Sequence, residues 1–279
     1  MALVINTNIA SLNAQRNLQG TQSSLSLSIQ RLSSGLRINS AKDDAAGLYQ
    51  VELQTADIRG INQATRNAAD GISLGQTAEG ALASIAQNLQ RIREIAVQAA
   101  NGTVEDRSGL QAEVNELTRE ISRIVQTTQF NGTALLSAAS SITFQVGADG
   151  NANNQVAVST TNMTSAAGIS AVYSADLTGG QTVVVSTQAA ASAALSSIDT
   201  AINTVSSTRA TFGAVQNRFE AVISNLQNYA ENLTASRSRI LDADFAQETA
   251  NLTRAQILQQ AGIAVLSQAN ALPQTARAL

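Results

Sequence analysis

Residues 81–102 read ALASIAQNLQRIREIAVQAANG and carry the clearest pattern of the chain. Apolar side chains recur in steps of three and four, at Leu82, Ile85, Leu89, Ile92, Ala96 and Ala99. This spacing places them along one stripe of an α-helix. Asn101-Gly102 is typical of a helix C-cap followed by a turn, so we expect the helix to end there.

The same rhythm extends in both directions from this stretch. The helix is predicted to begin near Tyr49 and, after the turn, to pair antiparallel with a helix at about 105–127. Glycines in its middle, Gly71 among them, should each weaken it by up to about 1 kcal/mol. Pro273 is the only proline, so long helices need not kink. Further helical stripes are predicted at about 5–36, 195–240 and 243–270.

In the middle of the chain the apolar residues recur at every second position instead of every third or fourth. Residues 141–146 alternate, Asp149-Gly150 is a turn pair, and residues 155–159 alternate again, which predicts a β-hairpin. Residues 169–185 are interpreted as further short strands around Gly179-Gly180. We therefore expect a β-hairpin-rich region at about 132–186.

The pattern as a whole predicts a mainly α fold. It is an elongated antiparallel helical bundle or coiled coil formed by the N- and C-terminal segments, with a small β-hairpin-rich insert. Stripes this narrow need partners, either the core of the same chain or another copy of it. The end segments bury little apolar surface, which barely offsets an ordering cost of about 1–2 kcal/mol per residue. We expect these ends to be loose in a single chain and to order against neighbours.

The composition excludes several kinds of chemistry. The chain has no His and no Cys, so imidazole and thiol catalysis, the corresponding metal sites and disulfides are excluded. Phosphate-binding and nucleophile-elbow motifs are missing, and Asp43-Asp44 is interpreted as a helix cap. We expect no enzyme activity, cofactor or metal. A net charge of −3 provides no basic surface for nucleic acid, and no stretch is apolar enough for a membrane span or a secretory signal peptide.

Several ordered stretches resemble the bacterial flagellins. Together they cover roughly residues 1–146 and 195–279. They are Ala2–Asn8, Leu32–Gly47, Asp70–Leu74, Thr77–Leu82, Thr128–Gly132, Ser236–Ile240, Arg254–Ala261 and Gln268–Asn270.

The resemblance implies a structural subunit that self-assembles into the helical flagellar filament, the propeller of bacterial swimming. Residues 1–44 and 243–279 would form a terminal coiled-coil domain that lines the inner tube of the filament. Residues 45–242 would form a rod domain of long helices, and the short centre implies that no large outer domain is present. The predicted assembly seams comprise Leu18, Leu25, Ile29, Leu32, Leu36, Leu252, Ile257, Leu258, Ala261 and Val265.

The resemblance also implies partners and a location. Flagellins are exported unfolded through the flagellum-specific type III apparatus, without a cleavable signal peptide, and add beneath a cap at the distal tip. A cytoplasmic chaperone typically holds the C-terminal segment until export, and hook-associated proteins join the filament to the hook. The expected location is therefore extracellular.

One segment resembles the stretch that vertebrate Toll-like receptor 5 reads on many flagellins. It runs over residues 90–98, and the implied contacts are Gln90, Arg91, Ile95 and Glu113. The alternative is that these residues serve filament packing alone. Receptor recognition would be a secondary property that depends on the host and on exposure of the monomer.

Two other functions compete with a filament subunit. The first is a hook–filament junction protein, which shares related termini but not usually the full set of rod-domain motifs. The second is a compact enzyme or binding domain with a defined pocket. Filament formation by the purified chain from seeds separates the first rival, and a compact, fully ordered monomer would favour the second.

Overall fold

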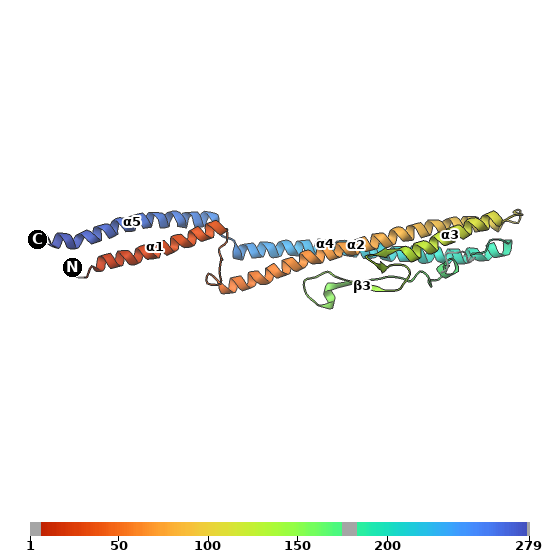
Figure 1. Ribbon diagram of the computed structural model, residues 1–279, viewed down its shortest axis with the longest axis horizontal. Coiled ribbons are helices and arrows are strands. Elements are labelled where there is room, and N and C mark those ends of the chain that lie inside the picture. Colours follow the sequence, from red (N-terminus) through yellow and green to blue (C-terminus); the bar gives the residue numbers. More distant parts are fainter. Residues whose placement is uncertain (1–6, 175–182, 278–279) are drawn as a thin grey trace. The chain divides into compact units, whose positions relative to one another are not determined.

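The computed structural model describes residues 7–174 and 183–277, with side chains of the last helix described to residue 271. Long α-helices dominate this part, and two small antiparallel hairpins accompany them (Figure 1), so the predicted mainly α fold class is confirmed. The α-helices are α1 Ile9–Ser34, α2 Ala45–Ala99, α3 Ser108–Thr127, α4 Gln188–Leu241 and α5 Phe245–Arg277.

The chain divides into two compact units. The first comprises Met1–Ile58 with Glu231–Leu279, and the second is Arg59–Ala230. Both boundaries lie inside long helices, α2 and α4. The boundaries expected from the sequence, at 44/45 and 242/243, instead coincide with the breaks between α1 and α2 and between α4 and α5.

In the first unit, α1 and α5 lie side by side and run antiparallel (Figure 1). Their covered positions follow a heptad pattern with steps of three and four, as in a coiled coil. In α1 these positions are Ser11, Ala14, Leu18, Thr21, Leu25, Ser28 and Leu32. In α5 they are Glu248, Leu252, Ala255, Gln259, Gly262, Leu266 and Ala269.

The break after α1 is built from backbone and carboxylate contacts. Gly35 ends the helix with φ 71°, and residues 35–37 pair with residues 241–243 through a bridge between Leu36 and Asp242. In the following loop Asp43 accepts hydrogen bonds from backbone N–H groups, that of Asn39 first, and these lower the pKa of its carboxyl. Asp44 Oδ1 accepts the Gly47 N–H at 2.8 Å at the start of α2, which is the predicted capping role.

The core of the second unit is built from α2, α3 and α4. The predicted stripe of α2 from Leu82 to Ala99 is confirmed, because all six of its side chains are fully buried. On α4, Phe219 packs edge-on against Phe144 of the hairpin, with ring centroids 5.4 Å apart. Gly71 of α2 makes room for this ring, since an added Cβ would lie 2.6 Å from Phe219. Gly71 therefore serves packing, a role that its expected weakening of the helix did not reveal.

The predicted hairpin is confirmed. Strand β3, Ser141–Gln145, pairs antiparallel with β4, Gln155–Ser159, in the register Ser141↔Ser159 to Gln145↔Gln155. The sequence missed a smaller hairpin, in which β1, Gln129–Phe130, pairs with β2, Thr133–Ala134.

The expectation of strands over 169–185 is wrong for the described residues of that stretch. Ile169–Ala171 forms a 3₁₀-helix, and Gly168 before it turns with φ 77° against the backbone of Ala201 on α4. The backbone of Val183 and Val185 bonds to the side-chain amide of Gln111 rather than to a neighbouring strand. Gly179-Gly180 lies outside the described residues.

Candidate functional site

The seam between α1 and α5 contains few large buried side chains. Leucine supplies its large apolar side chains, and the other covered positions hold small or polar residues. At Gly262 an added Cβ would lie 3.2 Å from Leu18 Cδ1, so the two helices approach closely there. A seam of this composition buries little apolar area, and burial of apolar area supplies most of the stability of helix pairs.

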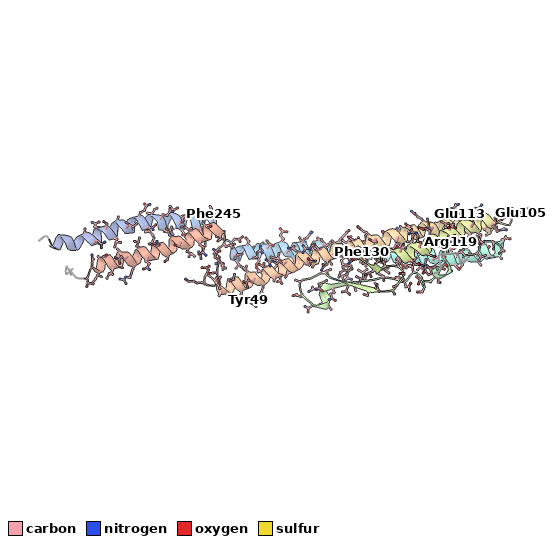
Figure 2. The ribbon with its side chains drawn as sticks, viewed as in Figure 1. Tyr49, Glu105, Glu113, Arg119, Phe130 and Phe245 are labelled. Atoms are coloured by element: carbon pink, nitrogen blue, oxygen red, sulfur yellow. The ribbon has the colours of Figure 1, made fainter. Side chains whose placement is uncertain are left out.

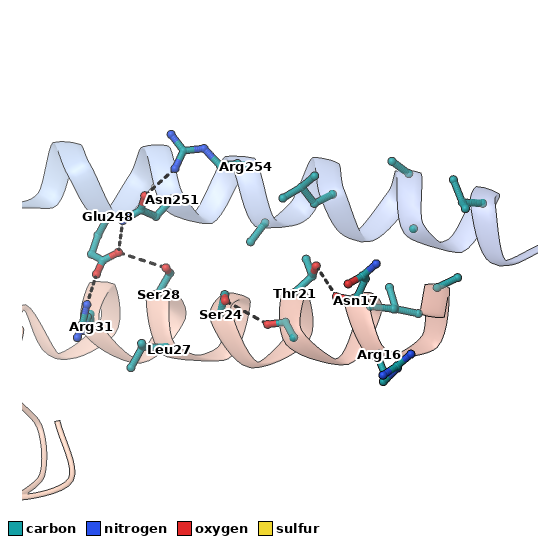
Figure 3. A pocket seen from close by; sticks show the side chains of 18 residues that line it. Arg16, Asn17, Thr21, Ser24, Leu27, Ser28, Arg31, Glu248, Asn251 and Arg254 are labelled. Atoms are coloured by element: carbon teal, nitrogen blue, oxygen red, sulfur yellow. Dashed lines mark hydrogen bonds and ion pairs between the residues drawn. The ribbon is translucent and has the colours of Figure 1, made fainter. Parts of the chain in front are cut away.

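A polar cluster centred on Glu248 joins the two helices (Figure 3). Arg31 Nη1 donates to Glu248 Oε1 at 3.0 Å, and Ser28 Oγ donates to Glu248 Oε2 at 3.2 Å. Asn251 Nδ2 adds a bond of 3.1 Å to the same oxygen. The hydrogen bond from Arg31 is the main cause that lowers the pKa of Glu248, against the opposing effect of its burial.

The other end of the pair carries a second polar contact. Asn8 Nδ2 donates to the backbone oxygen of Ala269 at 2.8 Å, and Ser11 Oγ donates to Asn270 Oδ1 at 2.8 Å. Asn8 also caps α1 by accepting the Ser11 N–H. Directional bonds at both ends therefore fix a register that the sparse apolar seam leaves poorly specified.

Acid should weaken the pairing of α1 with α5 through Glu248. Its pKa in the folded chain lies below the ordinary 4.5, so this carboxylate stabilises the pair above pH 4.5. That contribution is lost as the pH falls through the lowered pKa. We expect the helical circular dichroism of the native chain to decrease more over this acid range than that of a Glu248→Gln variant. Identical acid titration curves for the two proteins would refute the role of Glu248.

The outer faces of the same helices expose large apolar side chains. On α5, Ile257, Leu258 and Val265 are 60%, 52% and 58% exposed. A groove of about 850 Å³ runs along the pair (Figure 3). Leu258, Ala261 and Val265 line it from α5. Among the described side chains of the two helices, the other exposed large apolar residues are Ile9, Leu12, Leu27, Ile29, Phe245 and Ile263.

The predicted assembly seams thus separate into two sets. The half-buried set faces the interior of the first unit: Leu18, Leu25, Leu32 and Leu252 in the α1–α5 seam, and Leu36 in the bridge that follows α1. The exposed set consists of Ile29, Ile257, Leu258, Ala261 and Val265. We call this second set the outer stripe. Sequence reasoning missed Ser11, Ser28 and Glu248, which their heptad spacing to the leucines could have revealed.

The segment interpreted as a receptor contact, residues 90–98, lies on α2 of the second unit, and Glu113 lies on α3 (Figure 2). Arg91 Nε donates to Glu113 Oε1 at 2.7 Å, and Arg91 Nη1 lies 3.0 Å from Glu94. These bonds, that to Glu113 first, raise the pKa of Arg91. Gln90 is exposed as well, but Ile95 is 1% exposed and belongs to the core. A surface contact at this place therefore rests on Gln90, Arg91 and Glu113.

The described residues contain no group of three or more Asp or Glu side chains placed to hold a metal ion. None of the helices that the structure describes is long and apolar enough to cross a membrane.

Long helices with exposed apolar faces and a sparse inner seam define a structural subunit rather than a catalyst. Residues 5–141 match the family model described as the bacterial flagellin N-terminal helical region, and residues 195–277 match its C-terminal counterpart. The chain is 43% identical to a flagellin of Halalkalibacterium halodurans, with 98% of this chain and 97% of that protein covered. It is 42% identical to a flagellin of Bacillus subtilis, with 97% of each covered. The chain belongs to the bacterial flagellin family.

Membership of this family favours a filament subunit over an enzyme. The chain is a structural subunit of the flagellar filament, outside the cell, and it is not an enzyme. Flagellins polymerise with copies of themselves. A solved structure of a proposed flagellar hook-associated protein from Vibrio parahaemolyticus is 16% identical, with a TM-score of 0.57 over 72% of this chain and 100% of that one. That likeness extends to the fold alone, so it does not favour the hook–filament junction alternative.

Proposed function

We propose that the outer stripe is covered by neighbouring copies of the chain when the filament forms. The single observation that carries this proposal is the exposure of Ile257, Leu258 and Val265 along a helix whose inner seam is sparse. Apolar faces of this kind mark protein contacts, and contacts that do not close into a ring generate helical polymers.

The same contrast between exposed and buried apolar side chains supports a role for each of the two expected domains. Residues 1–44 and 243–279 form the terminal coiled coil that lines the inner tube. Residues 45–242 form the rod domain, whose fully buried core around Leu82 and Phe219 needs no neighbour to be stable. Seeded polymerisation of the purified chain, followed by electron microscopy, tests this assignment. Filaments support it, and a chain that stays monomeric beside active seeds contradicts it.

The export route belongs to the same proposal. The chain leaves the cell unfolded through the type III apparatus and adds beneath the cap at the distal tip. A cytoplasmic export chaperone covers the C-terminal segment, and hook-associated proteins hold the base of the filament. The sparse α1–α5 seam supports this route because it unfolds at low cost, and the absence of Cys removes the risk of cross-links in transit.

We also propose that free monomers present the cluster of Arg91, Glu113 and Gln90 to Toll-like receptor 5 of a vertebrate host. The support is the exposure of the Arg91–Glu113 ion pair, which joins two helices of the second unit. Replacing Arg91 and Glu113 with alanine should lower receptor binding by at least about tenfold, the equivalent of 1.4 kcal/mol. Arg119→Ala on α3 is the control with unchanged binding. Full binding by the double variant would remove the assignment.

A further inference from the structure

The chain contains the tripeptide Asn-Gly-Thr twice, at residues 101–103 and 131–133. Both asparagines and both glycines are exposed to solvent. The tripeptide is the same at the two sites, so a large difference in the chemistry of the two asparagines would come from the fold. The filament function described above uses neither of them.

Asparagine before glycine has a known intrinsic reactivity. The backbone nitrogen of the glycine attacks Cγ of the asparagine, a C–N bond forms, and ammonia leaves with the side-chain nitrogen. Water then opens the five-membered imide at either carbonyl and leaves aspartate or isoaspartate. The net change is hydrolysis of one amide to a carboxylate and ammonia, and it needs no oxidant and no cofactor. Glycine permits the attack because it has no side chain to obstruct the nitrogen.

The backbone around Asn101 leaves this reaction open. Asn101 lies in the turn between α2 and α3. Its backbone-to-backbone hydrogen bonds are long: the Asn101 N–H donates to Gln98 O at 3.2 Å, and the Val104 N–H donates to Asn101 O at 3.3 Å. In the described part of the chain, Gly102 N donates no hydrogen bond. The Thr103 N–H donates to Asn101 Oδ1 at 3.2 Å, which polarises the carbonyl that is attacked.

The backbone around Asn131 opposes the same reaction. Asn131 and Gly132 form the tight turn of the smaller hairpin, with φ of 47° and 78°. The pairs Phe130↔Thr133 and Gln129↔Ala134 hold both sides of this turn. Closing the imide ring would require Asn131 to leave its left-handed conformation, and therefore to break the hairpin.

We propose that Asn101 is a site of spontaneous conversion to aspartate and isoaspartate in the folded chain, and that Asn131 is protected from it. The product places a negative charge at the C-terminal end of α2, where the helix dipole disfavours it. Arg107 donates to Ala99 O at 2.7 Å and to Asn101 O at 2.9 Å, so the new carboxylate would compete with these carbonyls. The change would accumulate with the age of each subunit and loosen the turn between α2 and α3.

Peptide mapping by mass spectrometry tests the proposal on the full-length chain. Purified protein is incubated at mildly alkaline pH, both folded and in denaturant, and the deamidated fraction at each asparagine is followed with time. In denaturant the two identical tripeptides should react at similar rates. In the folded chain Asn101 should react several-fold faster than Asn131. Equal rates in the folded chain, or a faster Asn131, would overturn the proposal.

A matched variant separates this chemistry from general loosening of the fold. An added Cβ at Gly102 would meet only the Gln188 side chain, at 3.7 Å, so Gly102→Ala leaves the turn intact while it obstructs the attacking nitrogen. This variant should slow the reaction at Asn101 several-fold and leave Asn131 unchanged. If the reaction at Asn101 keeps its rate, the imide route is wrong.

Discussion

Phe219→Ala is expected to destabilise the second unit by about 3–5 kcal/mol, the range typical of removing a fully buried aromatic ring. The Phe219 ring is fully buried, lies against Gly71 of α2 and makes a T-shaped contact with Phe144. It joins the helices to the hairpin, so its removal leaves a cavity that neither partner can fill. Denaturant unfolding, followed by circular dichroism on the full chain, measures the loss.

Tyr229→Ala is the matched control for this prediction. Tyr229 is an aromatic residue of the same helix, α4, but it is 50% exposed. Its truncation should change the free energy of unfolding by no more than about 0.5 kcal/mol. If both variants lose the same stability, the position assigned to Phe219 at the centre of the core is wrong.

Leu258→Asp combined with Val265→Asp is expected to abolish filament growth and leave the monomer folded. Both side chains are more than half exposed in the single chain, so a carboxylate there remains solvated. In a polymer that covers the outer stripe the same carboxylates lose their water, which costs several kcal/mol for each ion. Sedimentation after seeding measures the effect, and the circular dichroism of the monomer should not change.

Asn151→Asp is the control for the added charge. Asn151 is exposed and lies between β3 and β4, far along the chain from the outer stripe. This variant should polymerise like the parent chain. Normal filament growth by the double aspartate variant would mean that the outer stripe stays exposed in the polymer.

The spacing of the leucines and isoleucines was sufficient to predict the helices of this chain. The stripe from Leu82 to Ala99 is the same in the sequence and in the core, because a run of this length with apolar residues every 3.6 positions fits no other regular structure. The strands at 141–159 were predictable for the corresponding reason, their period of two.

The features that the sequence could not predict depend on contacts between distant residues. Val183 and Val185 looked like part of a strand, yet the side chain of Gln111 bonds to the Val183 carbonyl and to the Val185 N–H. Gly71 was expected only to weaken α2, but its missing side chain leaves the space in which the ring of Phe219 packs. Periodicity reports which face of a helix is apolar, but it cannot report which partner covers that face.

The same limit applies to the candidate site. The sequence grouped Leu25 and Ile29 in one seam, whereas the structure half-buries Leu25 and leaves Ile29 51% exposed. The division between inner seam and outer stripe depends on where α5 lies, and that depends on Glu248 and its polar partners. Hydrophobic spacing alone carries no information about such a cluster.

Thiol labelling of a Val265→Cys variant tests the central claim most directly, because the natural chain has no cysteine. Asn151→Cys serves as the reference position, and both thiols should react readily in the monomer. In the filament we predict that the thiol at 265 is protected by a neighbouring copy while the thiol at 151 still reacts. Equal labelling at 265 in monomer and filament would contradict the claim that assembly covers the outer stripe.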